Sequence, residues 1–571
     1  MPPMFAETLR TVARAAGIRH GQLRSDLPEF FGIPSLIPPD LVRHWTRVIA
    51  RSRRLLETLP PPTGPRVAMI TTVAKLANNH SYAAVLAYAL RLRGADPVVI
   101  YCDSALAGCE RTTILHVSPE EFLLQGPRRI CSSCYLKGQE LFRVSGLPTY
   151  PLSRFLTPEA RREIEDFVTS LPPEEYYRFS YKGLELGPQV EASVARFFFS
   201  HAPDLSEPNR KVAARFVSGA VTMAEAMLRM DAELTPKIFA PCYGVYVSRG
   251  TPWLVAQAKG KRCVTWARMD VEETITLGEG GHPIVELAAR RTGPWNDLAL
   301  TREQRARLDA FLSKSEQGDS ARTVNRNPVA NRAALLQELR LDPARPIVAM
   351  YSNCGFDSKL LYTTPLYPDV LSWTFDTIER FRGRREQLVI RVHPYESWIP
   401  LIEQTAARIA QRFPELPENI RVVPPESALS SYALGRASQA ALVYGSLIGL
   451  ELAATGTPVI AAGRGAYWQK GFTYDVHTHA DYAALLNQLE DLAKPNPERT
   501  QAARRFAYYY YLMRQLPFAP FNHDVHAGLQ RAPWWKVFRS LSDLGPGHDP
   551  HLDAICDHFL YGREALAGEG A

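Results

Sequence analysis

Two apolar runs that each stop at a polar cluster constrain the fold of this chain more than any other feature. The first, Leu388–Val392, is short and rich in β-branched residues, and it ends at His393-Pro394, where proline cannot continue a β-ladder. In the second, Ala441–Tyr444 is typical of a strand, Gly445-Ser446 of a turn and Leu447–Thr455 of a helix. Short buried strands that pass directly into turns and helices indicate a parallel sheet in an α/β fold.

The segments that follow these strands carry residues suited to a nucleotide. A Gly445-Ser446 turn that opens a helix presents backbone N–H groups and a hydroxyl to an anion. Glu451, in the early turns of the same helix, is placed where a carboxylate could reach ribose hydroxyls. Arg391 shares a face of its strand with His393, so it either adds charge to the site or pairs with Glu396. The pattern indicates a nucleotide-linked ligand.

A second α/β signal lies in the N-terminal half. Val67–Thr71 predicts a strand, Tyr82–Arg93 predicts an amphipathic helix with Ser81 as its N-cap, and Pro97–Tyr101 predicts another strand. Together they form a βαβ unit of the nucleotide-binding kind. Further strands are expected at 237–240, 262–266, 347–352, 388–392, 421–423, 441–444 and 458–462. The sequence therefore predicts an α/β protein with two tandem Rossmann-type parallel sheets.

A length of 571 residues is too great for one hydrophobic core. We expect four segments along the chain. They are a helical N-terminal extension over 1–60, a Rossmann-like domain over 61–335 with a helical insertion at about 105–235, a second Rossmann-like domain over 336–490, and C-terminal helices over 491–571.

Composition is that of an ordinary globular enzyme, with 46% hydrophobic and 22% charged residues. Eight cysteines in so long a chain do not describe a secreted disulfide scaffold, and no basic-then-apolar leader is evident, so we expect a cytoplasmic protein. Ala440–Gly463 is long enough to span a bilayer. It contains Glu451 and a Gly456-Thr457-Pro458 break, so we interpret it as strand–helix–strand.

The net charge of +7 is unevenly placed, because residues 1–65 contain nine arginines, no lysine and five acids. Cationic helices of this kind suit anionic lipid headgroups or a lipid-pyrophosphate substrate, which would place the protein on the inner face of the cell membrane. A solvated helical face explains the same charge. Nucleic-acid binding is not expected, since no recognised module or basic-aromatic array is present.

Several motifs occur together between about 345 and 520: Ser352-Asn353-Cys354-Gly355-Phe356-Asp357, Arg391–Glu396, Ser431-Tyr432, Gly445-Ser446 with Gly449-Leu450-Glu451, Gly471-Phe472-Thr473 and the tyrosine-rich Ala507–Arg514. With them, this part of the chain resembles the capsule polysaccharide biosynthesis family of bacterial glycosyltransferases. The His-Pro and Ser motifs are also similar to those of bacterial sialyl- and Kdo-transferases. The resemblance implies a GT-B fold, in which the second Rossmann domain binds a nucleotide-sugar donor, the first binds the acceptor, and C-terminal helices cross back onto the first.

Carried over by this resemblance, His393 would contact a donor phosphate, and Ser446 with the N–H groups after it would hold the same phosphate. Glu451 would bind the ribose, and Asn353 and Gly449 belong to the same donor motifs. Phosphate contacts of this kind strengthen as charge develops on the leaving group.

Two aromatic segments have plain alternatives. Tyr467, Lys470 and Gly471 follow the strand 458–462, where a parallel sheet presents its ligand loops, and they either close over the donor or form a simple surface loop. Tyr508–Tyr511 places aromatic rings all round a helix, which favours packing against both domains over a sugar-stacking platform.

The group that would take the proton of an acceptor hydroxyl is harder to identify. Inverting transfer needs a carboxylate or an imidazole within hydrogen-bond reach, whereas retaining transfer needs no such base. His80, in the loop before a predicted helix, and Asp357 are the candidates, with Asp103 as a further one. His80 could instead support the helix N-terminus, and Asp357 could orient the Asn353 loop.

Four of the eight cysteines, Cys102, Cys109, Cys131 and Cys134, fall within 33 residues. The C-x2-C spacing of the second pair can hold zinc, and four thiolates would leave no open position, so a zinc ion here would be structural. The first pair is wider than zinc-ribbon spacing. Buried free thiols are therefore the alternative, with a redox pair as a third. No catalytic metal is expected.

Together these features favour a nucleotide-sugar-dependent glycosyltransferase that builds a surface polysaccharide on a saccharide or lipid-linked acceptor. CMP-, UDP- and GDP-linked donors all fit the motifs. A glycerophosphate-type transferase would use the same phosphate contacts, and a non-catalytic assembly protein that binds a nucleotide sugar would keep the site without a base.

Overall fold

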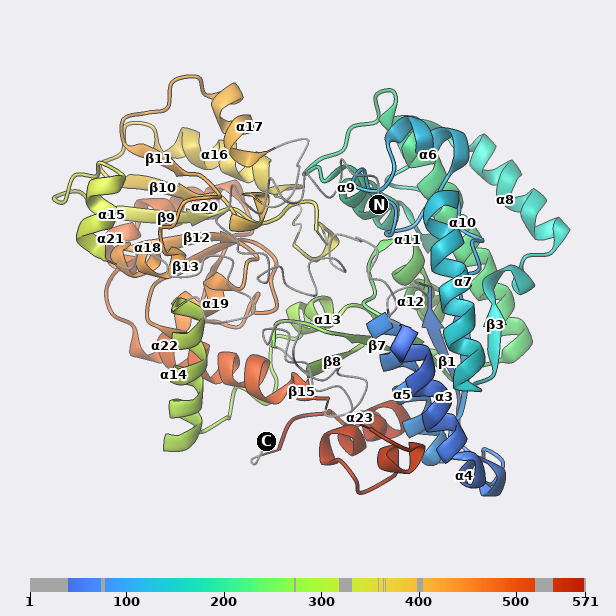
Figure 1. Ribbon diagram of the computed structural model, residues 1–571. Coiled ribbons are helices and arrows are strands. Elements are labelled where there is room, and N and C mark those ends of the chain that lie inside the picture. Colours follow the sequence, from blue (N-terminus) through green and yellow to red (C-terminus); the bar gives the residue numbers. More distant parts are fainter. Residues whose placement is uncertain are drawn as a thin grey trace. The chain divides into compact units, whose positions relative to one another are not determined.

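The computed structural model describes residues 39–72, 77–271, 274–317, 331–357, 359–362, 364, 366–397, 404–518 and 538–568. Most of the predicted N-terminal extension, residues 1–38, lies outside them. The chain divides into two compact units (Figure 1). Unit 1 comprises Met1–Phe198, Pro203–Pro283 and Arg514–Ala571, and unit 2 comprises Phe199–Ala202 and Ile284–Met513.

Unit 1 is built on a seven-stranded sheet in the order β15-β8-β7-β6-β1-β2-β3. Its strands are β1 (Arg66–Thr71), β2 (Asp96–Tyr101), β3 (Thr149–Pro151), β6 (Ile238–Pro241), β7 (Arg262–Ala267), β8 (Thr274–Glu279) and β15 (Leu516–Pro517). The neighbouring strands β3, β2, β1, β6 and β7 pair in parallel. The strand β8 pairs in antiparallel fashion with β7 on one side and with β15 on the other. The strand order reverses between β1 and β6, so the parallel part is doubly wound with its switch point there.

Helices cover both faces of this sheet, which is why its strands are continuous apolar runs. Val67 and Met69 of β1 pack on one face with α3, α5 and α23, while Ala68 and Ile70 pack on the other with α9, α10 and α12. The helices of unit 1 are α3 (Pro39–Arg51), α4 (Arg53–Thr58), α5 (Ala77–Leu92), α6 (Pro119–Gln125), α7 (Arg128–Ser145), α8 (Pro158–Ser170), α9 (Gly187–Phe198), α10 (Asn209–Leu234), α11 (Tyr246–Arg249), α12 (Thr251–Ala258) and α23 (Pro550–Tyr561). A two-stranded sheet, β4 (Ser180–Tyr181) and β5 (Leu184–Glu185), lies within the helical insertion.

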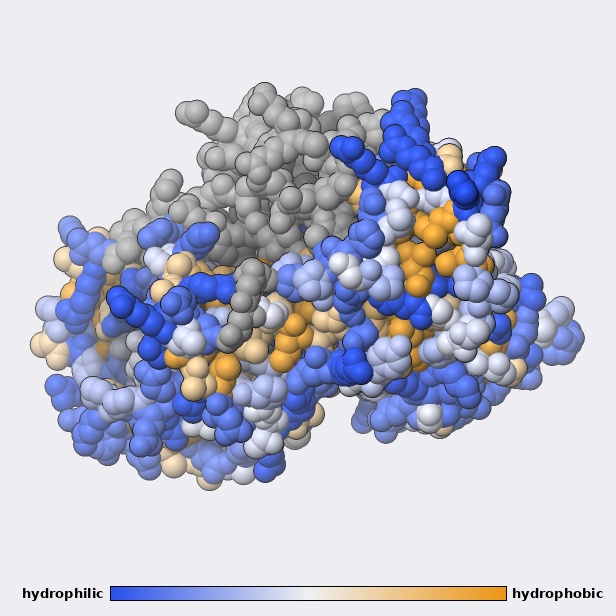
Figure 2. Space-filling view, turned by 90° about the horizontal axis from the view of Figure 1, so that it is seen from below, coloured by the Kyte–Doolittle hydropathy of each residue, from blue (hydrophilic) through white to orange (hydrophobic). Residues whose placement is uncertain are grey.

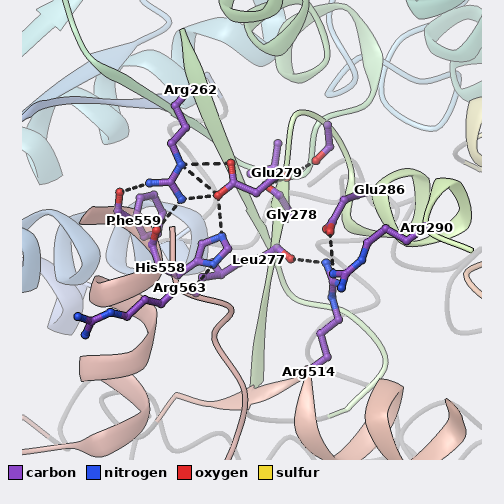
Figure 3. Close-up of polar contacts among 12 residues, drawn as sticks. Arg262, Leu277, Gly278, Glu279, Glu286, Arg290, Arg514, His558, Phe559 and Arg563 are labelled. Carbon is purple, nitrogen blue, oxygen red and sulfur yellow. Dashed lines mark hydrogen bonds and ion pairs between the residues drawn. The ribbon is translucent and has the colours of Figure 1, made fainter. Parts of the chain in front are cut away.

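The C-terminal helix α23 is fastened to the sheet of unit 1 by an ionic cluster (Figure 3). Arg262 at the start of β7 donates to the Glu279 carboxylate at 3.1 Å and to the carbonyls of His558 and Phe559. His558 Nε2 lies 3.1 Å from the same carboxylate. Burial alone would raise the pKa of Glu279, but the hydrogen bonds and charges of His558 and Arg262 hold it below its ordinary value.

Unit 2 has a six-stranded sheet in the order β11-β10-β9-β12-β13-β14, and every pairing in it is parallel. Its strands are β9 (Ile347–Tyr351), β10 (Gln387–Arg391), β11 (Ile420–Val423), β12 (Ala440–Tyr444), β13 (Val459–Gly463) and β14 (Tyr474–Asp475). Numbered within the unit, the order is 3-2-1-4-5-6, the Rossmann arrangement, with its switch point between β9 and β12.

Helices again lie on both faces of the unit 2 sheet. Buried side chains of α16 and α20 pack on one face with Val348, Leu388 and Leu442, and α18 and α19 contact β9 and β12 from the other. The helices are α13 (Pro283–Ala289), α14 (Arg302–Glu316), α15 (Arg332–Glu338), α16 (Val370–Phe381), α17 (Thr405–Arg412), α18 (Ser431–Ala437), α19 (Ile448–Ala454), α20 (His479–Asn487), α21 (Leu489–Leu492) and α22 (Pro497–Tyr508), which a π-helical turn extends over Tyr509–Met513.

The predicted fold class, α/β with two tandem Rossmann-type sheets, is confirmed, and three local predictions need correction. The helix α5 begins at Ala77, so Ser81 is not its N-cap but accepts a hydrogen bond from Trp45 Nε1 at 3.4 Å inside the core. The second unit begins at Ile284 rather than at 336, because α13 and α14 pack onto it. Lys470, for example, donates to the carbonyl of Leu287 at 2.9 Å. Residues 491–513 belong to unit 2, and only the chain from Arg514 onward belongs to unit 1.

Within the described ranges, no helix is both long and apolar enough to cross a bilayer.

Candidate functional site

The carboxyl edge of the unit 2 sheet gathers the polar residues that follow its central strands. In doubly wound sheets this edge, beside the switch point, is where ligands bind. Residues 352–357 follow β9, His393 follows β10, Gly445-Ser446 follows β12 and Arg464 follows β13. Because β10, β9, β12 and β13 are consecutive neighbours in the sheet, the structure brings these segments to one edge.

The loop after β9 and the end of β12 are joined across the switch point by Asn353. Its Nδ2 donates to the main-chain carbonyl of Tyr444 at 3.0 Å, and its Oδ1 accepts from the N–H of Cys354 at 2.8 Å. Gly445 then turns with φ of +73°, and a Cβ there would lie 2.0 Å from the carbonyl oxygen of Arg464. No other residue fits this turn, so glycine sets the close approach of the β12 and β13 loops.

Hydrogen bonds fix the proton on the outer nitrogen of His393. Its Nδ1 accepts from the main-chain N–H of Tyr395 at 3.2 Å and lies 3.2 Å from Cys354 Sγ, while the main-chain N–H of His393 donates to Ser352 Oγ at 2.9 Å. Burial, with the charge of Arg391 adding to it, lowers the pKa of His393 to about 4. The imidazole is therefore neutral at physiological pH and carries its proton on Nε2, as a hydrogen-bond donor.

Three donors at this edge have no partner among the described residues. They are His393 Nε2, the hydroxyl of Ser446 and the guanidinium of Arg464, and His393 and Ser446 are partly exposed while Arg464 is exposed. A neutral N–H, a hydroxyl and a cation together suit the oxygens of a phosphate group, to which guanidinium forks bind bidentately. Arg464 escaped the sequence analysis, although its position in Gly463-Arg464-Gly465, directly after a strand, could have identified it.

Two of the predicted site residues bind protein groups instead of facing solvent. The buried guanidinium of Arg391 donates to the carbonyls of Pro424 and Ser427, the latter at 3.0 Å. Glu396, 1% exposed, accepts from the hydroxyl of Thr405 at 2.7 Å and from its N–H at 2.9 Å. Arg391 thus orders the loop after β11 and does not pair with Glu396.

Glu451 is also buried, at 3% exposure, and its carboxylate accepts from two tyrosine hydroxyls. Tyr432 donates to Oε2 at 2.6 Å and Tyr511 donates to Oε1 at 3.1 Å. Tyr511 belongs to the tyrosine-rich segment, so this segment supports α19. Gly449, the second residue of α19, is required because a Cβ would lie 2.5 Å from Tyr467 Oη.

The loop after β13 mostly supports its neighbours. The hydroxyl of Tyr467 donates to the carbonyl of Ser446 at 2.7 Å and so holds the turn after β12. Lys470, 8% exposed, donates to the carbonyls of Leu287 and Trp468, and burial lowers its pKa to about 8. The carbonyl of Gly471 accepts from Arg499 at 2.8 Å.

The candidates for a catalytic base are placed as follows. His80 lies in the first turn of α5 rather than in a loop, and its side chain lies outside the described residues. Asp357 is partly exposed at the carboxyl edge of unit 2, where its N–H closes a turn on the carbonyl of Cys354 at 3.0 Å. Asp103 accepts from the N–H and hydroxyl of Ser153 in unit 1.

Among the four clustered cysteines, burial, with a smaller contribution from neighbouring thiols, raises the pKa of Cys102 to about 12 and of Cys131 to about 11. Burial also holds the pKa of Cys109 well above its ordinary value. The described residues, which include all four, contain no group of three His, Cys, Asp or Glu side chains placed to hold a metal ion. The arrangement therefore does not fit the zinc site considered from sequence.

A second polar cluster, which sequence reasoning missed, lies at the carboxyl edge of unit 1. Glu110, 5% exposed, accepts from both the hydroxyl of Ser248 at 2.6 Å and Arg249 Nε at 2.8 Å, and Ser248 Oγ lies 2.9 Å from Thr72 Oγ1. Thr72 follows β1 and Ser248 follows β6, so the cluster spans the switch point of this sheet. No spacing in the sequence connects Glu110 to residues so far along the chain.

The loop after β6 is strained beside this cluster. Tyr243 and Tyr246 adopt φ of +72° and +74°, which are costly for aromatic residues and cluster at ligand sites. Their rings stack at 6.2 Å, with Arg196 over one and Arg249 over the other.

Comparison with known proteins gives only distant likenesses. No protein-family model matches the chain, and no curated protein matches it. Among solved structures, it is similar to Thermosulfurimonas dismutans KpsC, a β-Kdo 2,4 transferase, with 14% identity, 47% of this chain and 79% of that chain covered, and a TM-score of 0.31. The Thermosulfurimonas dismutans KpsC β-Kdo 2,7 transferase follows, with 12% identity, 49% and 80% covered, and a TM-score of 0.29.

A third likeness is the Streptomyces sp. SF2575 glycosyltransferase SsfS6 in complex with thymidine diphosphate, with 12% identity, 78% of this chain and 94% of that chain covered, and a TM-score of 0.23. Scores at this level carry no inference about activity. The function is therefore argued from the site.

Proposed function

We propose that the protein is a glycosyltransferase of the GT-B type that transfers a sugar from a nucleotide-activated donor to a growing surface polysaccharide or lipid-linked acceptor. The observation that carries the proposal is the carboxyl edge of unit 2, where His393 Nε2, the Ser446 hydroxyl and the Arg464 guanidinium have no partner in the described part of the chain. The Rossmann order of the sheet supports the proposal, because ligands of doubly wound sheets bind at the carboxyl edge beside the switch point.

The three donors suit the chemistry of glycosyl transfer. As the bond from the anomeric carbon to the phosphate oxygen breaks, negative charge collects on the nucleotide phosphate that leaves, and donors fixed beside it stabilise the transition state more than the ground state. The new bond forms between the acceptor oxygen and the anomeric carbon. In an inverting reaction the acceptor proton passes to a base, for which His80 and Asp357 are the candidates.

Further parts of the proposal follow from the sequence motifs. The donor is linked to CMP, UDP or GDP, the acceptor binds unit 1, and the reaction takes place in the cytoplasm at the inner face of the cell membrane. The strained loop after β6 and the Glu110 cluster are the residues of unit 1 suited to such an acceptor site. A glycerophosphate-type transferase is the second candidate, since the same three donors would hold its activated phosphate.

The substitution His393→Ala tests the proposal. A screen of CMP-, UDP-, GDP- and CDP-linked donors by thermal shift identifies the nucleotide first, because a ligand of the native state raises its melting temperature. Transfer or donor hydrolysis should then fall about 10²- to 10³-fold in the variant. The matched control is His551→Ala, in α23 of unit 1, where the ring lies 3.7 Å from Asp549.

The outcomes separate the alternatives. Full transfer by His393→Ala would contradict the assignment of the donor site. Turnover of an activated glycerophosphate instead of any nucleotide sugar would favour the second candidate. Binding of a nucleotide sugar with no turnover under any condition would make the protein a binding component of an assembly.

A further inference from the structure

One face of unit 1 carries more arginines than acids. Five arginines and two acids, Asp40 and Glu57, occur on α3 and α4. All five are exposed, and their positions are Arg43, Arg47, Arg51, Arg53 and Arg54. The side chains of the last four make no hydrogen bond or ion pair with any described residue. We call α3, α4 and the C-terminal end of α7 the arginine face.

Some of the other exposed arginines of unit 1 form ion pairs. Arg129 lies 3.1 Å from Glu121, and Arg162 lies 3.1 Å from Glu159. On the arginine face, Arg47 and Arg51 stand at i, i+4 spacing on α3, where like charges repel along a helix. An anion bound beside them would relieve this repulsion.

The arginine face is held firmly by the opposite side of its helices. Trp45 and Val48 are fully buried in the core of unit 1, and the ring of Trp45 packs against Phe538 at 5.4 Å. Ser52, between α3 and α4, accepts from the N–H of Leu541 at 2.8 Å. Because these anchors prevent the helices from rolling, the arginines stay directed outward.

The arginines border an apolar groove. A depression of about 440 Å³ lies between α3, α4 and the end of α7, and it is lined by Thr46, Ile49, Ala50, Arg53, Leu56, Glu57 and Val144. In the view of Figure 2, hydrophobic side chains reach the surface of unit 1 between strongly hydrophilic ones. Cationic side chains beside apolar ones suit an amphipathic partner that carries an anionic group next to a hydrocarbon chain.

We propose that the arginine face docks the protein on an anionic phospholipid membrane. Guanidinium groups bind phosphate oxygens bidentately, and arginines near an anionic bilayer each contribute to attraction. The groove takes the glycerol and upper acyl part of a lipid below its phosphate, as interfacial helices do with their apolar side. A nucleic acid offers phosphates but nothing to fill an apolar groove, so a membrane fits both features. The inference rests on the proposed function in one respect only, namely that the acceptor is linked to a membrane.

The test uses the full chain and sedimentation with vesicles of phosphatidylcholine, with or without phosphatidylglycerol. Binding should require phosphatidylglycerol and weaken as salt is raised, since exposed charges are screened. The double substitution Arg47→Glu and Arg51→Glu should weaken it by more than about tenfold. Both side chains are exposed and make no hydrogen bond or ion pair with a described residue, so folding should be unaffected.

The control is Arg161→Glu with Arg162→Glu on α8, an exposed helix that also carries acids. It should bind vesicles like the unaltered protein. Equal binding to both vesicle types, or full binding by the Arg47/Arg51 variant, would overturn the proposal. The proposal would also be overturned if that variant lost self-association or RNA binding while its binding to vesicles stayed the same. Nucleotide binding, measured in parallel, reports on unit 2 and separates failure of this inference from failure of the proposed function.

Discussion

Asn353 Nδ2 donates to the main-chain carbonyl of Tyr444 at 3.0 Å, and this one hydrogen bond ties the loop after β9 to the end of β12. The two strands are neighbours in the sheet but are far apart in the sequence. Their carboxyl ends form the switch point of unit 2, so the side chain of Asn353 sets the spacing between the two loops that present the candidate phosphate donors.

Asn353→Ala should therefore weaken nucleotide binding about tenfold. It leaves the buried Tyr444 carbonyl and the Cys354 N–H without partners, and a buried group that loses its partner costs about 1–3 kcal/mol. Calorimetric titration with the best nucleotide measures the effect. Asn496→Ala is the matched control, because Asn496 caps α22 and its loss should cost about 1 kcal/mol of stability without changing affinity. Equal loss of affinity in both variants would mean that the bridge has no special role.

The contact between Tyr511 and Glu451 predicts a stability effect. Tyr511→Phe removes a donor from a buried carboxylate, and we expect the free energy of unfolding of unit 2 to fall by about 1–3 kcal/mol. Denaturant unfolding followed by tyrosine and tryptophan fluorescence measures it. Tyr508→Phe, on the same helix and with no hydrogen bond to a described residue, should change stability little. A similar loss in both variants would assign the effect to ring packing.

Glu396 predicts a pH dependence of stability. Burial raises its pKa from 4.5 to about 7, against the opposing effect of the hydrogen bonds from Thr405. Since the folded pKa lies above the unfolded one, the contribution of this group is fully present below pH 4.5 and is lost as pH rises through 7. The loss amounts to about 3 kcal/mol.

Glu396→Gln keeps a hydrogen-bond acceptor for Thr405 but cannot titrate. Its unfolding free energy should change less between pH 4.5 and 8 than that of the unaltered protein, with the two converging at low pH. Glu415→Gln, at an exposed position, should follow the unaltered protein. If the curve for Glu396→Gln runs parallel to the others, the carboxyl of Glu396 does not titrate in this range.

Much of the fold was predictable because buried parallel strands leave a clear sequence signal. The strands β1, β2, β6, β7, β9, β10, β12 and β13 were all expected within a residue or two. The apolar run Val67–Ile70 illustrates why, since both faces of the strand are covered. The strands β8 and β15 were not expected. At the edge of the sheet, β15 is only two residues long and pairs with a distant segment.

The candidate site was less predictable, because sequence names residues but not the direction of their side chains. Arg391 and Glu396 lie in the predicted motif, yet one binds loop carbonyls and the other binds Thr405. Glu110 and Ser248 show the opposite problem, since folding brings together two residues that no local pattern connects. Strand position was the reliable guide, and His393 and Ser446 follow from it.

Arg464→Ala provides the sharpest test of the phosphate site. Arg464 is exposed, and its side chain makes no hydrogen bond or ion pair with a described residue, so the substitution should leave stability unchanged. Loss of a charged hydrogen bond costs about 1.5–3 kcal/mol, so nucleotide affinity should fall at least about tenfold, and less so at high salt. Arg464→Lys should recover only part of the loss, because an ammonium keeps the charge but not the fork. The control is Arg385→Ala, an equally exposed arginine just before β10, at the amino edge of the same sheet. Unchanged affinity in Arg464→Ala, or equal loss in Arg385→Ala, would remove Arg464 from the site.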